Sequence, residues 1–312
     1  SMIKYIVRRL IALIPVLLGV KLIIFTLLYF TPGDPALVML GDEATPEAIA
    51  QIHEELGWND PFWVRYFNYV VDLLHGDLGV SYTNGRPVFD LLVERLPKTI
   101  TLALISTTIA VTLGILLGVI AAIKQNSIFD NLCMLLALVG VSMPHFWQGL
   151  LLMLLFGVKL GWLPISGWGE VGNVVLPSLT IGLGSMAIIA RMTRSSMLEV
   201  INQDYINFAR AKGQKNGKII TGHELRNALI PIITTIAIQF GNMLGGSVIT
   251  ETIFAIPGVG KLMVDSIRSG NYPVVQGGVL LIAFIYCINN LLVDVIYAFV
   301  DPRVKTNLSN AR

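Results

Sequence analysis

The stretch DYINFARAKGQKNGKIITGHELRNALIP, residues 204–231, decides how this chain folds, because it is the most basic loop and it separates two long apolar runs. Asp204 can cap a short helix, and Gly213 can end that helix in a left-handed conformation. Ala209 and Ala211 are small enough to permit close approach of a partner. The stretch leads directly into an apolar segment, so we expect a short helix beside a membrane span that serves as a docking site for a partner.

The composition of the chain excludes a soluble domain of this size. Of its 312 residues, 54% are hydrophobic and only 13% are charged, and the mean hydropathy is +0.71. Cys133 and Cys287 both lie in apolar runs, so neither a disulfide framework nor a metal site is indicated. The four histidines are scattered, and no pair of them has the spacing of metal ligands. We expect a multi-pass protein in contact with membrane lipid, with no nucleic-acid partner.

Six apolar runs are long enough to cross about 30 Å of hydrocarbon. They are residues 6–30, 100–123, 129–158, 174–190, 229–249 and 279–300. Pro144 lies inside the third run, which is therefore either one kinked helix or two short segments. The pattern predicts an all-α membrane protein with six transmembrane helices.

The distribution of basic residues sets the orientation. With six spans and the N-terminus inside, the inner side carries 14 Lys and Arg residues and the outer side 7, with Lys21 in a span. Seven spans would place the loop 191–228 outside, against the positive-inside rule. We therefore expect the following parts: a cytoplasmic N-terminus and first span (1–30), an extracytoplasmic loop domain (31–99), a membrane core (100–300) with a cytoplasmic loop at 191–228, and a cytoplasmic tail (301–312).

Two helices are predicted in the outer loop. Thr45 followed by Pro46 is a helix start, and Gly57 is the corresponding stop. Asp60 and Pro61 open a second helix that is rich in aromatic residues and ends near residue 76. We expect its aromatic face to lie at the membrane interface rather than to stack on a ligand.

Charged residues inside a bilayer are costly and are candidates for function. The two that we single out are Lys21 and Asp294. Lys21 either lines a passage or extends outward to the interface, whereas Asp294 is expected to hold helices together near the inner side. Gly241, Gly245 and Gly246 would allow their span to approach a counterpart helix closely.

From end to end, an ordered set of short motifs resembles the B-type permease subunit of dipeptide, oligopeptide and nickel ABC importers. The motifs are YIVRR (5–9), TPGDP (31–35), GDLG (76–79), RLP (95–97), GVSMP (140–144), WLP (162–164), GGSV (245–248), PGVG (257–260) and DPR (301–303). In that family, the segment corresponding to 204–231 is the EAA loop, whose coupling helix sits in a cleft of the ATP-hydrolysing subunit. This chain departs from the family pattern at Asn271, where Asp is usual, and at Glu224, where a small residue is usual.

The resemblance implies the type I permease architecture of a bacterial inner-membrane protein that is not itself an enzyme. Its implied partners are a second homologous permease subunit, two cytoplasmic ATP-binding subunits and an extracytoplasmic solute-binding protein. Residues 255–262 lack the first Gly and the final Ser or Thr of a phosphate-binding loop, so ATP and Mg²⁺ are expected on the partners. The residues expected at the ATPase contact are Tyr205, Phe208, Ala209, Arg210, Ala211, Lys212, Gly213 and Arg226.

The substrate that the resemblance implies is a di- or oligopeptide, with a nickel chelate as the alternative within the family. A self-sufficient secondary transporter would need an ion-sensitive carboxylate pair, which we do not find in the expected spans. A membrane-embedded enzyme would need clustered His, Asp, Glu or Ser side chains at one depth, and these are also not indicated.

Overall fold

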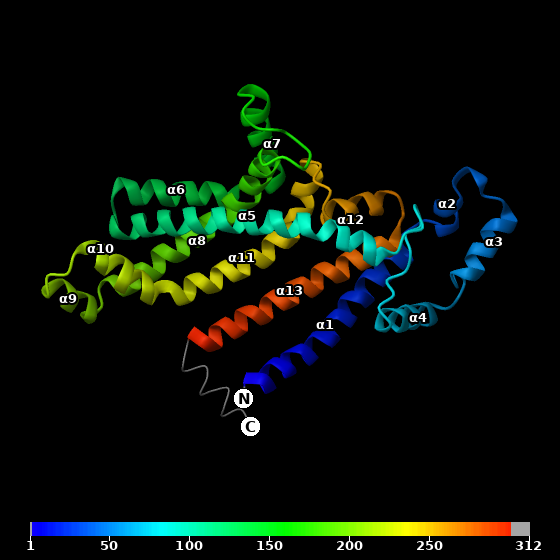
Figure 1. The fold of residues 1–312 in the computed structure, drawn as a ribbon, viewed down its shortest axis with the longest axis horizontal. Coiled ribbons are helices and arrows are strands. Elements are labelled where there is room, and N and C mark those ends of the chain that lie inside the picture. Colours follow the sequence, from blue (N-terminus) through cyan, green and yellow to red (C-terminus); the bar gives the residue numbers. More distant parts are fainter. Residues whose placement is uncertain (1, 301–312) are drawn as a thin grey trace. The chain divides into compact units, whose positions relative to one another are not determined.

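The structure is a computed structural model that describes residues 2–300 (Figure 1). Within this range the chain forms helices and a single isolated bridge between Val80 and Pro87, so the all-α prediction is confirmed. The expected tail, with Asp301, Pro302 and Arg303, lies outside the described residues. The described residues divide into two compact units, one of residues 2–6, 100–256 and 288–300, and one of residues 7–99 and 257–287.

The helices, in chain order, are α1 (Met2–Phe30), α2 (Pro35–Leu40), α3 (Pro46–Glu55), α4 (Phe62–Leu74), α5 (Val88–Ile123), α6 (Ile128–Ser142), α7 (His145–Leu152), α8 (Gly172–Ile201), α9 (Asp204–Ala211), α10 (Asn216–Ile219), α11 (Leu225–Ile253), α12 (Val259–Arg268) and α13 (Tyr272–Val300). A 3-10 turn, η1 (Gly41–Glu43), follows α2. Two π-helical segments, η2 (Met153–Lys159) and η3 (Ile220–Glu224), follow α7 and α10.

Five of these helical segments are long and apolar enough to cross a membrane, and α6 with α7–η2 makes a sixth if the bent pair counts as one span. The pair is bent by 108° at Met143 and Pro144. Pro144 cannot continue α6, because it has no N–H to donate and it pushes the preceding residue into an extended conformation. Of the two forms predicted for the third run, the structure adopts two short segments.

All five long helices extend beyond the predicted spans, and α13 begins at Tyr272 rather than at residue 279. The helix predicted over 100–123 begins at Val88, and the one predicted over 174–190 continues to Ile201. The helix predicted from residue 229 forms a continuous span-length segment from Asn216, through α10, η3 and α11. The predicted boundaries were wrong because they followed the apolar residues, whereas the hydrogen-bonded backbone continues through the polar residues that flank them.

The core of the first unit is built on α8, which packs against α6, α7 and α11 (Figure 1). Leu176, Ile189 and Met243 belong to its main apolar cluster and are all almost fully buried. On α5, Gly118 lies against α8, where an added Cβ would come within 2.5 Å of Thr193 Cβ. The glycine is therefore required for close packing of α5 on α8.

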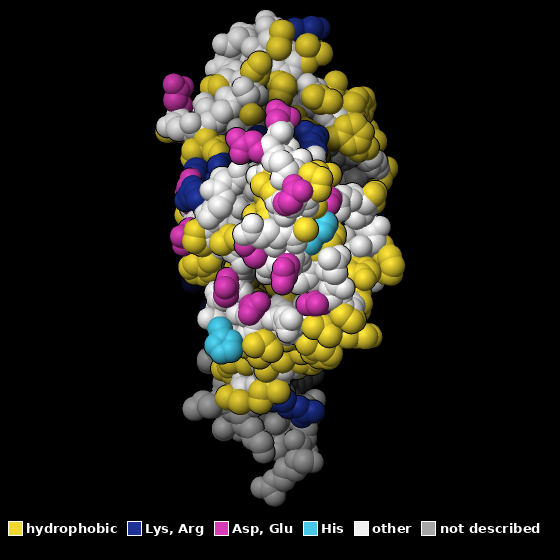
Figure 2. Space-filling view, turned by 90° about the vertical axis from the view of Figure 1, so that its right-hand side faces the viewer, with side chains coloured by type: hydrophobic (Ala, Val, Ile, Leu, Met, Phe, Trp, Pro, Cys, Tyr) yellow, Lys and Arg dark blue, Asp and Glu magenta, His cyan; other side chains and the backbone are white. Residues whose placement is uncertain are grey.

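The second unit contains the loop helices. Thr45 caps α3, where its hydroxyl oxygen accepts a hydrogen bond from Ala48 N–H at 3.3 Å, so the predicted helix start is confirmed. Figure 2 shows acidic side chains gathered on the face that includes η1 and α3. The exposed carboxylates of these two elements are Asp42, Glu43, Glu47, Glu54 and Glu55.

The aromatic residues of α4 divide between two faces. Tyr66 is buried and contacts Phe25 of α1, with ring centroids 5.6 Å apart, whereas Trp63 and Phe67 are exposed. The expectation that the aromatic face lies at the interface therefore applies only to the exposed residues, since Tyr66 fixes α4 to α1.

Candidate transport pocket and coupling segment

The predicted loop 191–228 is mostly helical. It contains the end of α8, all of α9 and the start of the long helical segment that leads into α11. Gly213 has φ of +74°, so the predicted left-handed stop after α9 is confirmed. The prediction that Asp204 caps α9 was wrong, because Gln203 occupies the N-cap and Asp204 is the first helical residue. Its carboxylate lies in the first helical turn, where the helix dipole favours negative charge.

The two alanines of α9 lie on different faces. Ala209 is 7% exposed and packs with Ile206 and Ile219 in a small apolar cluster that joins α9 to α10. Ala211 is exposed. Of the two alanines predicted to admit a partner, only Ala211 is therefore accessible, because Ala209 is used to fix α9 against its own chain.

The exposed face of α9 is aromatic and basic. Tyr205 is 46% and Phe208 61% exposed, and the Lys212 ammonium lies 4.5 Å from the centroid of the Phe208 ring. An exposed phenylalanine on a short helix costs solvation free energy unless a partner covers it. Together with exposed Arg226, these side chains form the coupling surface, a name used below for Tyr205, Phe208, Ala211, Lys212 and Arg226.

Arg210, predicted at the ATPase contact, is paired within the chain. Its guanidinium donates to Glu224 Oε1 at 2.9 Å, and the Glu224 side chain is only 2% exposed. A second hydrogen bond, of 2.9 Å, joins His223 Nε2 to Gln214 Oε1. Glu224 lies in η3, so α9 is anchored at the base of α11. The sequence shows Glu224 as a departure from the family pattern but does not predict its pairing with Arg210.

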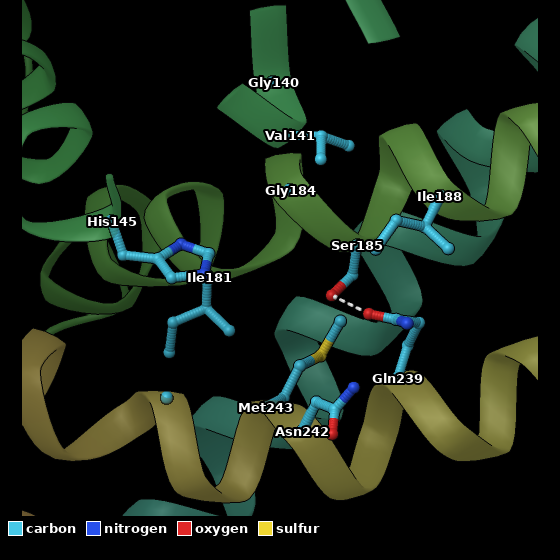
Figure 3. Close-up of a pocket in the computed structure, with 11 residues that line it drawn as sticks. Gly140, Val141, His145, Ile181, Gly184, Ser185, Ile188, Gln239, Asn242 and Met243 are labelled. Carbon is cyan, nitrogen blue, oxygen red and sulfur yellow. Dashed lines mark hydrogen bonds between the residues drawn. The ribbon is translucent and has the colours of Figure 1, made fainter. Parts of the chain in front are cut away.

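A pocket of about 210 Å³ lies within the same unit, between α6, α7, α8 and α11 (Figure 3). Its polar lining consists of His145, Ser185, Gln239 and Asn242. Ser185 Oγ donates to Gln239 Oε1 at 3.1 Å. The remaining lining residues are apolar or glycine: Gly140, Val141, Ile181, Gly184, Ile188, Met243 and Gly246.

Glycine 184 allows the His145 ring to reach the pocket, since an added Cβ would come within 3.1 Å of the ring carbon Cε1. The pocket lining contains no carboxylate and no Lys or Arg. Amide, hydroxyl and imidazole groups can donate to carbonyl oxygens and accept from N–H groups. The pocket can therefore form hydrogen bonds with peptide groups without selecting a charge.

The three glycines of α11 have different environments. Gly241 is buried within the chain. Gly245 and Gly246 face open space, since an added Cβ at either residue would meet no heavy atom within 4 Å. An approach by a second permease is therefore possible at Gly245 and Gly246, whereas Gly241 lies inside the chain.

Lys21 does not extend to the interface. Its side chain is fully buried, its ammonium donates to Gln276 Oε1 at 2.7 Å, and it lies over the Tyr69 ring. These contacts join α1 to α4 and α13. Lys21 therefore lies in a contact between packed helices. On α13, Asn289 donates to the carbonyl oxygen of Ala237 at 2.8 Å, which joins α13 to α11. The helix-joining role of Asp294 remains a prediction.

Asp130 is a buried carboxylate that the sequence analysis missed. It is 2% exposed and accepts two hydrogen bonds from Arg194, of 2.6 and 2.7 Å. The signal for it in the sequence is a carboxylate at the edge of the apolar run 129–158. Among the described residues, no group of three or more His, Cys, Asp or Glu side chains could hold a metal ion.

Residues 114–306 match the family of binding-protein-dependent transport system inner membrane components, and residues 2–103 match the N-terminal region of such components. The chain is 43% identical to the dipeptide transport system permease protein DppB of Alkalihalophilus pseudofirmus, over 97% of this chain and 100% of the relative. It is 41% identical to the glutathione transport system permease protein GsiC of Salmonella typhimurium, over 97% and 99%. An inward-facing structure of the MetNI methionine ABC transporter matches 68% of this chain and 97% of its own, with a TM-score of 0.58 and 20% identity. That last likeness concerns the fold alone.

Proposed function

This chain belongs to the family of binding-protein-dependent transport system inner membrane components, and we propose that it forms half of the passage of an ATP-driven dipeptide importer. It is a multi-pass protein of the inner membrane and acts as a transport subunit rather than an enzyme. The observation that carries the proposal is the match over the whole length of a dipeptide permease at 43% identity.

The structure supports a mechanical route from the coupling surface to the pocket. Phe208 and Tyr205 lie exposed on α9, and the pair of Arg210 with Glu224 joins α9 to η3. The helical segment then continues without a break into α11, which carries Gln239 and Asn242. Movement of α9 by an ATPase would turn α11 and change the access to the pocket, as alternating access requires.

The assembly that we propose contains a second homologous permease, two cytoplasmic ATP-binding subunits and an extracytoplasmic binding protein. ATP and Mg²⁺ would bind to the ATP-binding subunits. The exposed aromatic and basic side chains of α9 suit a cleft that is apolar at its centre and acidic at its rim. Gly245 and Gly246 would lie where the second permease approaches.

Peptides are the substrate class that the pocket supports, rather than nickel chelates. The relatives described above are named for dipeptide and glutathione transport. The pocket offers hydrogen-bonding side chains and, apart from the single imidazole of His145, no side chain that binds nickel, which suits the neutral amide groups that all peptides share.

The test is uptake by proteoliposomes that contain the chain with its co-purified ATP-binding and permease partners. Addition of the cognate binding protein, a labelled dipeptide and ATP should give uptake, and a labelled nickel chelate should give none. Asn242→Leu should lower dipeptide uptake at least tenfold while permease-stimulated ATP hydrolysis persists. Uptake by the chain alone, without ATP, would show a secondary transporter and contradict the proposal.

A further inference from the structure

A second cavity, of about 540 Å³, lies between the inner ends of α6 and α8. It shares no lining residue with the transport pocket. Its lining residues are Asn126, Asp130, Asn131, Met134, Leu138, Arg191, Arg194 and Ser195. The distribution of basic residues along the chain places these helix ends on the cytoplasmic side, at the level of the lipid headgroups. Neither the coupling surface nor the transport pocket uses these residues.

Of the two arginines that line the cavity, only Arg191 is not neutralised by a carboxylate of the lining. Asp130 accepts both hydrogen bonds from Arg194, and one of its oxygens also accepts from Asn126 N–H at 2.9 Å. Arg194 is thus neutralised within the cavity wall. Arg191 is exposed and forms no ion pair within the described part of the chain. With two arginines and one carboxylate, the lining has a net charge of +1.

The lining is also amphiphilic along α6. Asn131 lies close to the cationic end, and Met134 and Leu138 follow it at helical spacing. Leu135 and Leu136, which do not line the cavity, are 55% and 59% exposed, so the surface of α6 beyond the cavity is apolar. The cavity therefore joins a basic, hydrogen-bonding end to an apolar surface directed along a membrane helix.

We propose that this cavity binds the headgroup of an anionic phospholipid such as phosphatidylglycerol, with its phosphodiester on Arg191 and an acyl chain along Met134 and Leu138. A phosphodiester carries one negative charge, which matches the net charge of the lining. Arginine forms paired hydrogen bonds with phosphate oxygens, and basic pockets between membrane helices on the cytoplasmic side bind anionic headgroups. The inference depends on membrane placement and not on which substrate is transported.

The experiment measures lipid binding to the purified complex in neutral detergent, by native mass spectrometry and by thermal unfolding. Phosphatidylglycerol should be retained and should raise Tm by several degrees more than phosphatidylcholine with the same acyl chains. Arg191→Gln should abolish the difference, and Arg191→Lys should restore part of it. The matched control is Lys218→Gln, which removes another exposed cytoplasmic cation and should leave the preference intact.

Four results would overturn the proposal. The first is an unchanged phosphatidylglycerol preference in Arg191→Gln, and the second is an equal loss in Lys218→Gln, which would indicate general surface charge. The third is equal stabilisation by water-soluble glycerol phosphate, which would indicate a free anion. The fourth is loss of the ATP-binding subunits from Arg191→Gln with the lipid preference retained, which would make Arg191 a protein contact.

Discussion

A carboxylate at residue 224 needs a partner, because the side chain is only 2% exposed and burial of an unpaired charge is costly. Arg210 supplies that partner, although its own side chain is 45% exposed. The pair is therefore intermediate between an exposed salt bridge and a fully buried one. Its structural consequence is to fix α9 to the start of α11, so that Arg210 stabilises the coupling segment internally.

Arg210→Ala should destabilise the coupling segment by about 1–3 kcal/mol, since it leaves Glu224 buried without its cation. The charge-reversed double variant, Arg210→Glu with Glu224→Arg, should recover part of the loss. Lys215→Ala is the control, because Lys215 is exposed. The measurement is the thermal unfolding of each purified variant. Additive losses in the double variant would show that the two residues do not interact.

Lys21, whose side chain is fully buried, donates to an amide oxygen, that of Gln276. Lys21→Met should cost about 1–3 kcal/mol, because the partly buried Gln276 Oε1 loses its donor. The double variant Lys21→Met with Gln276→Leu should cost less than the sum of the single variants. Since Lys21 is not on the lining of a described pocket, the uptake ratio of acidic to basic peptides should not change. A change in this ratio in transport assays would place Lys21 on the passage instead.

At the scale of elements, α9 has one face that its own chain covers and one that it leaves open. Phe208→Ala should abolish ATP-dependent uptake and permease-stimulated ATP hydrolysis together, with Tm nearly unchanged, because the ring is 61% exposed. Ala209→Glu should instead lower Tm, since it places a carboxylate between Ile206 and Ile219. Paired assays of ATP hydrolysis and unfolding separate these effects. If the Phe208→Ala variant keeps wild-type uptake and permease-stimulated ATP hydrolysis, the proposed coupling role of α9 is wrong.

The sequence predicts most elements of this fold and misses their packing. Long apolar runs indicate the membrane helices because hydrocarbon forces the backbone to bond internally. The same runs do not show that α5 begins at Val88, because Asp90, Glu94, Arg95 and Lys98 interrupt the apolar residues of its first three turns. They also do not show that Ala209 is buried, since that depends on Ile219 of another helix. Local signals at Thr45 and Gly213 are reliable because each is fixed by neighbouring backbone.

The candidate site is predictable to different degrees. The coupling segment stands out because it is polar and basic between two spans. The pocket does not, because Ser185 and Gln239 are 54 residues apart on different helices and are ordinary polar residues within apolar runs. Only the packing of α8 against α11 brings them together.

At the scale of the whole chain, the bent pair α6 and α7–η2 determines the sidedness of everything after it. If the pair crosses the membrane, the chain has six spans, and residues 84 and 215 lie on opposite sides. If the pair enters and returns on the same side, the chain has five spans, and both residues lie on one side. The positive-inside rule favours six, because five would move the most basic loop to the side of the acidic α3.

Single cysteines at residues 84 and 215 test this sidedness, in a background where Cys133 and Cys287 are replaced by alanine. Both positions are exposed, so a membrane-impermeant maleimide can reach each from its own side. In intact spheroplasts, Asn84→Cys should react at once, and Lys215→Cys should react only after permeabilisation. Reaction of both from outside would show that the bent pair does not cross. The coupling surface would then face away from the cytoplasmic ATP on which the proposed mechanism depends.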